Sequence, residues 1–85
     1  MSFEVELLRD LADRLRGRRE RAVAAFVAHR LRTWAGAVES GDRDAIVVAL
    51  KTAATPVRTG YGFELECYAE AARLLRRALD ATRAA

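Results

Sequence analysis

Apolar residues recur at the spacing of an α-helix along most of this 85-residue chain, and little in the sequence interrupts them. The chain has one proline and five glycines, and few stretches alternate apolar and polar residues as strands do. Helices with an apolar stripe bury that stripe against one another. The sequence therefore predicts an all-α fold, a small antiparallel bundle of three or four helices that forms one domain over residues 1–85.

The apolar stripe changes direction near Gly17. Before this glycine, four leucines form one stripe: Leu7, Leu8, Leu11 and Leu15. After it, five residues form a second stripe: Val23, Val27, Leu31, Trp34 and Val38. On one ideal helix the two stripes would lie roughly 90–110° apart, so a straight helix could not bury both against one partner. We expect the first long helix to be kinked or broken near Gly17, with helices over about 3–15 and 19–38 as the simplest account.

Two further breaks organise the rest of the chain. The segment 40–42 closes the second helix, and Asp42 is a natural N-cap for a helix over about 43–54, because its carboxylate can accept from free backbone amides. That helix is apolar almost all round, so we expect it to be the most buried. Pro56 should end it, since the residue before a proline is disfavoured in the helical region.

The last predicted helix has the most regular pattern. Apolar residues there alternate spacings of four and three and continue to Thr82, which predicts an oligomer seam made of Tyr61, Leu65, Tyr68, Ala72, Leu75 and Leu79. A second apolar line runs beside it: Cys67, Ala71, Leu74 and Ala78. Such a helix can face two neighbours at once. Because so short a chain forms a thin core, we expect self-association, most simply as a homodimer.

Five arginines fall within eight residues: Arg14, Arg16, Arg18, Arg19 and Arg21. Residues 14–32 carry seven arginines against one acid, whereas residues 1–13 carry four acids against one base. The cluster therefore predicts binding to an acidic partner, either a protein or a nucleic acid, or pairing with the chain's own acids. Because Glu20 interrupts it and no aromatic residue is interleaved for base stacking, nucleic acid is the less favoured alternative.

Arg30 and Arg58 define a candidate anion site. Arg30 lies inside the apolar stripe of the second helix, so it must reach water, pair with a carboxylate of the last helix or stack on Trp34. Arg58 lies in a glycine-containing segment before the last helix, where backbone amides can receive an anion. Binding of an anion or small ligand is thus a second alternative.

Catalysis and metal binding have little support in the sequence. His29 and Cys67 are the only residues of their kinds, and no spacing pairs either with a nucleophile, a base or further ligands, so we expect no cofactor and no metal site. A lone cysteine fits a reducing compartment. The first residues carry acids where a signal peptide carries bases, and no apolar run approaches about 20 residues, so we expect a cytoplasmic protein without membrane contact. A non-catalytic interaction and assembly module is the primary hypothesis.

Overall fold

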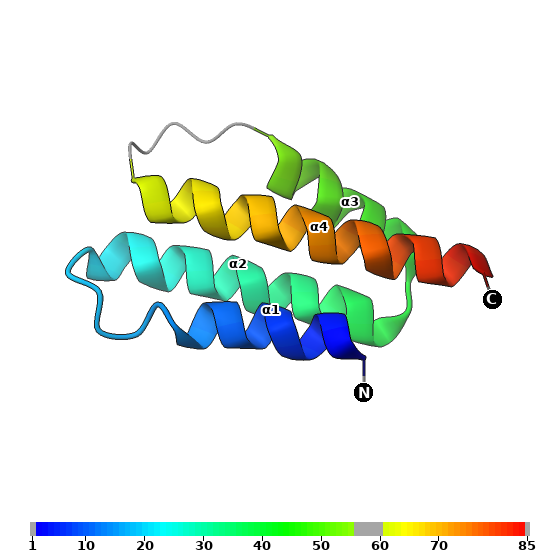
Figure 1. Ribbon diagram of the computed structural model, residues 1–85, viewed down its shortest axis with the longest axis horizontal. Helices are drawn as coiled ribbons and strands as arrows, with labels where there is room; N and C mark the ends of the chain where they lie inside the picture. The colour runs from blue at the N-terminus through cyan, green and yellow to red at the C-terminus, as the bar shows by residue number, and fades with distance from the viewer. Residues whose placement is uncertain (1, 56–60, 85) are drawn as a thin grey trace.

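The computed structural model describes residues 2–55 and 61–84, which form four α-helices. The helices are α1 (Phe3–Asp13), α2 (Arg21–Ser40), α3 (Arg43–Ala54) and α4 (Gly62–Ala84). Consecutive helices run in opposite directions (Figure 1). The predicted all-α antiparallel bundle is therefore confirmed. None of the described helices combines the length and the apolar character needed to cross a membrane.

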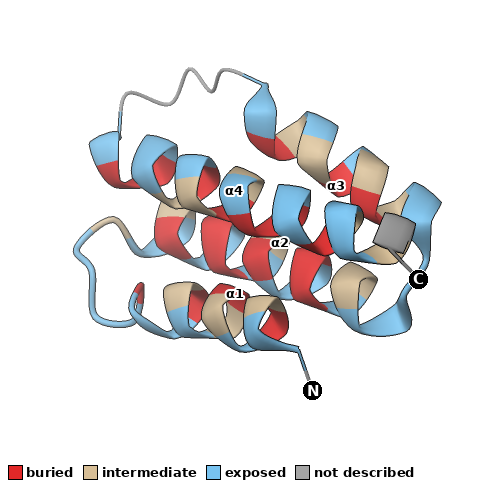
Figure 2. Cartoon of the chain, turned by 45° about the vertical axis from the view of Figure 1, so that its right-hand side comes forward, coloured by how far each residue is buried: buried red, intermediate tan, exposed pale blue. Residues whose placement is uncertain are grey.

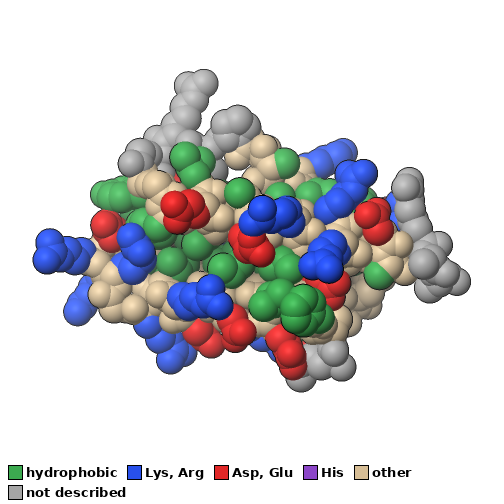
Figure 3. Space-filling model, viewed as in Figure 1, with side chains coloured by type: hydrophobic (Ala, Val, Ile, Leu, Met, Phe, Trp, Pro, Cys, Tyr) green, Lys and Arg blue, Asp and Glu red, His purple; other side chains and the backbone are tan. Residues whose placement is uncertain are grey.

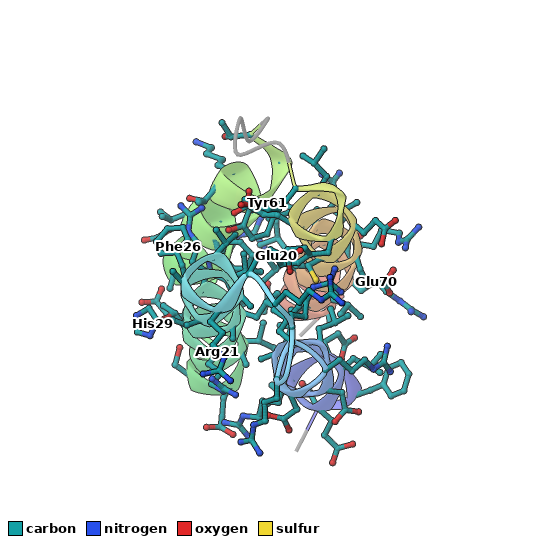
Figure 4. The ribbon with its side chains drawn as sticks, turned by 90° about the vertical axis from the view of Figure 1, so that its left-hand side faces the viewer. Glu20, Arg21, Phe26, His29, Tyr61 and Glu70 are labelled. Carbon is teal, nitrogen blue, oxygen red and sulfur yellow. The ribbon has the colours of Figure 1, made fainter. Side chains whose placement is uncertain are left out.

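The bundle is built around α2 and α4, which pack against each other. Helices α1 and α3 lie on opposite sides of this pair, and each contacts both central helices (Figure 4). Buried residues lie on the faces that the helices turn toward one another (Figure 2). Each helix contributes a fully buried aliphatic side chain to one core: Leu8, Leu31, Ile46 and Leu75.

The predicted break near Gly17 is confirmed. Helix α1 ends at Asp13, and residues 14–20 form a turn in which Gly17 has a φ angle of 82°. This left-handed conformation is costly for residues that carry a Cβ atom. The two apolar stripes therefore belong to two separate helices that pack side by side, and each stripe can face the core.

Helix α3 begins and ends at the predicted residues, but it is less buried than predicted. The Asp42 carboxylate accepts hydrogen bonds from the backbone N–H groups of the next turn, at 3.0 and 3.4 Å. Thr55, before the proline, has a ψ angle of 130°, so the helix ends where it was predicted to end. The expectation that this helix is the most buried was wrong, since Val48 is 64% exposed. The reason is that α3 lies at one side of the central pair and has neighbours on one face only.

The short length of α3 shapes the surface of the molecule. Helix α3 has 12 residues, whereas α2 has 20 and α4 has 23. The Arg43 side chain donates to the Thr82 hydroxyl at 3.2 Å, so α3 begins beside the C-terminal end of α4. At about 1.5 Å per residue, α3 reaches roughly half of the way along α4. No helix covers the N-terminal halves of α2 and α4 on that side (Figure 1).

Candidate functional site

The five clustered arginines are exposed at one end of the bundle, in the turn from α1 to α2 and at the first residue of α2. Basic side chains project from this end in Figure 3. The Asp13 carboxylate lies 3.2 Å from Nη2 of Arg32 and 3.9 Å from Nη2 of Arg16. Among the described residues, no carboxylate lies within 4.0 Å of the guanidinium of Arg14, Arg19 or Arg21. The chain's own acids therefore neutralise only part of the cluster.

Four arginines surround a shallow groove between this turn and α2: Arg16, Arg18, Arg21 and Arg32. The groove has a volume of about 540 Å³, and between Arg21 and Arg32 its α2 wall carries three small side chains, Ala24, Ala25 and Ala28. Asp13 is the acidic residue in its lining. We call this feature the arginine groove. The sequence interpretation missed Arg32, although the spacing of Arg21, Ala25, Ala28 and Arg32 by four, three and four residues places all of them on one side of a helix.

Arg18 connects the α1–α2 turn to α4 through a contact with Phe63. Its guanidinium lies 4.0 Å from the centroid of the Phe63 ring, and its Nε atom lies 3.7 Å from the Glu20 carboxylate. A guanidinium over an aromatic ring is attracted by the charge distribution of the ring. One turn further along α4, burial raises the pKa of the Cys67 thiol above its usual 9.0, although the charges of Arg18 and Arg14 act in the opposite direction. The thiolate form is therefore disfavoured at neutral pH.

Arg30 joins α2 to α4 on the other side of α2. Its Nη1 atom donates to the Tyr68 hydroxyl at 3.3 Å, and this hydroxyl donates to Oε2 of the fully buried Glu64 at 3.2 Å. The guanidinium also lies 5.1, 5.9 and 5.5 Å from the ring centroids of Phe26, Trp34 and Tyr68. The predicted contact of Arg30 with Trp34 is present. In place of the predicted direct pair with a carboxylate of the last helix, the hydroxyl of Tyr68 lies between Arg30 and Glu64.

Burial also perturbs the hydroxyl at the centre of this network. The pKa of Tyr68 is raised above its usual 10.0 mainly by desolvation, while the hydrogen bond from Arg30 lowers it. Arg58, the second member of the candidate anion site, lies outside the described residues. The network around Arg30 is therefore a contact between two helices that joins a buried acid, a hydroxyl and a half-buried base.

The residues of the predicted oligomer seam divide into two groups. Four are buried or half-buried within a single copy of the chain, where they pack in or against its core: Tyr68, Ala72, Leu75 and Leu79. Tyr61 and Leu65 remain 39% and 51% exposed. The seam is thus used largely within the bundle, because α4 packs against α2 and α3. Its first two members remain accessible to another molecule.

A large apolar side chain of α2 is exposed on the same side of the bundle. Phe26 is 54% exposed, and its ring contacts Arg30, which in turn reaches Tyr68, one helical turn from Leu65. We call the surface formed by Phe26, Arg30, Tyr61 and Leu65 the apolar face. In Figure 4, Phe26 and Tyr61 lie toward α3, whereas Arg21 of the arginine groove lies toward α1. From the sequence, Phe26 is a neighbour of Arg30 in the apolar stripe of α2, and its exposure was not predicted.

The remaining chemically reactive side chains do not converge. Within the described part of the chain, no three metal-ligating side chains come together. His29 is exposed on α2, and its backbone carbonyl accepts from the Thr33 hydroxyl at 2.9 Å. Comparisons of the chain with protein-family models, curated proteins and solved structures find no match. The arginine groove and the apolar face, on opposite sides of α2, are therefore the two candidate sites.

Proposed function

We propose that this protein is a non-catalytic helical interaction module that pairs with a second copy of itself through the apolar face. The observation that carries the proposal is the joint exposure of Phe26, Tyr61 and Leu65 where α3 ends. Large apolar side chains that cluster on the surface of a globular domain are typical of protein-contact sites. Here they lie on two neighbouring helices, so a second pair of helices could cover them.

The shape of the apolar face is complementary to a second copy of itself. Leu65 projects from α4, and the exposed residue that follows it on the same side of the helix is the small Ala69. Small side chains allow a second helix to approach closely, while Phe26 and Leu65 project toward it. In a two-fold dimer each copy offers the same patch to the other, so projecting residues of one copy can lie over small residues of its partner.

The charge on the apolar face is compatible with burial in a dimer. Arg30 is its charged member, and its guanidinium already contacts Phe26, Trp34 and Tyr68. Arginines in contact with aromatic rings are common at protein interfaces. A chain of 85 residues also has a high ratio of surface to volume, so pairing would add apolar burial to a thin core.

Size-exclusion chromatography with light scattering tests the proposal at ~100 μM, well above ordinary dimer dissociation constants. The chain should elute with the mass of a dimer, and the double variant Phe26→Ser/Leu65→Ser should elute as a monomer. Phe3→Ser is the matched control, because Phe3 is 60% exposed and lies at the first residue of α1, at the opposite end of the bundle. This variant should remain a dimer.

Circular dichroism on the same samples separates loss of pairing from loss of folding. The substituted side chains are exposed, so each variant should keep the helical signal of the parent chain. A folded parent chain that is monomeric at this concentration would refute the proposal. A Phe3→Ser variant that dissociates as readily as the double variant would also refute it, because pairing would then not depend on the apolar face.

A further inference from the structure

We infer that the arginine groove binds a compact phosphate-bearing anion, of the diphosphate or triphosphate class. The groove lies on the opposite side of α2 from the apolar face, so this site is independent of the proposed pairing. Four arginines line it against Asp13, and Glu20 pairs with Arg18 beside it, which still leaves an excess of positive charge around a small volume. Planar guanidinium groups bind phosphate oxygens through two parallel hydrogen bonds, which an ammonium group cannot do.

Two of the four guanidinium groups already approach one anionic oxygen. Arg32 of α2 and Arg16 of the turn both approach the same oxygen, Oδ1 of Asp13, although they come from opposite walls of the groove. Arg21 lines the same groove and has no carboxylate within 4.0 Å among the described residues. A phosphate group offers more oxygens than Asp13 and could bind several of these arginines at once.

The N-terminus of α2 adds to the positive potential beside the groove. Its N-cap residue, Glu20, makes no capping hydrogen bond with its side chain, and the first turn of the helix carries no acid. The positive end of a 20-residue helix therefore lies beside Arg21 without a capping side chain. The dipole of α2 therefore adds to the positive charge that the arginines supply.

The size and lining of the groove favour a small anion over a nucleic acid. Its volume of about 540 Å³ is typical of sites for small ligands. Its lining contains no aromatic residue, so it offers no ring on which bases could stack. Toward the other end of the α1–α2 pair the surface carries the exposed acids Glu6 and Asp10, together with Glu39, which pairs with Arg9 at 3.3 Å. A long polyanion that extended from the groove would meet this acidic surface.

Calorimetric titration of the full chain with inorganic pyrophosphate and tripolyphosphate, at ~50 mM NaCl to limit screening, tests the inference. We expect saturable binding of one anion per chain. Arg21→Ala and Arg32→Ala should each weaken binding about tenfold, because each removes a charge-assisted hydrogen bond. The matched control is Arg19→Ala, which removes the same charge from the same turn but lies outside the groove, and it should weaken binding by less than about threefold.

Asp13→Asn gives a test of opposite sign. The Asp13 carboxylate competes with the ligand for Arg16 and Arg32, so its neutralisation should strengthen binding by about threefold or more. Circular dichroism of each variant confirms that it is folded. Three results would overturn the inference: no binding heat up to ~5 mM anion, an equal loss of affinity in Arg19→Ala, or tighter binding of a short DNA duplex than of tripolyphosphate at ~150 mM NaCl.

Discussion

Alanine substitutions at Gly17 and Gly36 should change the stability of the fold in opposite directions. At both positions an added Cβ atom would meet no neighbouring atom within 4 Å, so neither change creates a clash. Gly17 has a φ angle of 82°, and a residue with a Cβ atom pays roughly 1–2 kcal/mol for that conformation. Gly36 lies inside α2, where alanine is favoured over glycine by about 0.5–1 kcal/mol.

Thermal unfolding followed by circular dichroism, at one fixed protein concentration, measures both effects. For a domain of this size, 1 kcal/mol changes Tm by about 4–8 °C. Gly17→Ala should therefore lower Tm by at least about 4 °C, and Gly36→Ala should raise it by about 2–8 °C. Gly41, with a φ angle of 72°, should respond to alanine as Gly17 does. A Gly17→Ala variant as stable as the parent would refute the reasoning, because α1 and α2 would then not be separated by a left-handed turn.

Three further predictions concern the core and its ionisable groups. Folding raises the pKa of the Tyr68 hydroxyl above 10.0, so as pH rises the unfolded chain loses the hydroxyl proton before the folded chain does. The contribution of this hydroxyl to stability is therefore complete below about pH 10 and is lost as pH rises through the folded-state pKa. Urea midpoints should therefore fall more steeply between about pH 9 and 11 for the parent chain than for Tyr68→Phe, and equal slopes would contradict this. Cys67 should react with a thiol reagent at about pH 8 more slowly in the folded chain than in urea, since burial raises its pKa, and equal rates would show that the thiol is not protected. Leu31→Ala should destabilise the chain by about 2–5 kcal/mol in urea unfolding, because Leu31 is fully buried, and a loss below about 1 kcal/mol would place it outside the core.

The helices and their breaks could be predicted from the sequence because they depend on local chemistry. Gly17 supports a left-handed turn, Asp42 caps α3, and Pro56 excludes its neighbour from the helix. The environment of Arg30 was predictable for a related reason. A base inside an apolar stripe must find a partner, and the last helix carries both the hydroxyl and the acid that provide one.

The two candidate surfaces could not be predicted in the same way, because they depend on how far each helix extends beside its neighbours. Phe26 and Leu65 are exposed because α3 ends before it reaches them, and no local pattern gives that relative length. Val48 is exposed for another tertiary reason, because α3 has neighbours on one face only although its sequence is apolar almost all round. Arg32 belongs to the arginine groove because α1 and the following turn pack against α2, which is a tertiary contact.

Sedimentation equilibrium of the unmodified chain tests the central claim, pairing through the apolar face, most directly. The chain has a mass of 9.4 kDa. Over a range of about 5–200 μM, which brackets ordinary dimer dissociation constants, the weight-average mass should rise with concentration toward twice that value. A mass that stays at 9.4 kDa over the whole range would contradict the account.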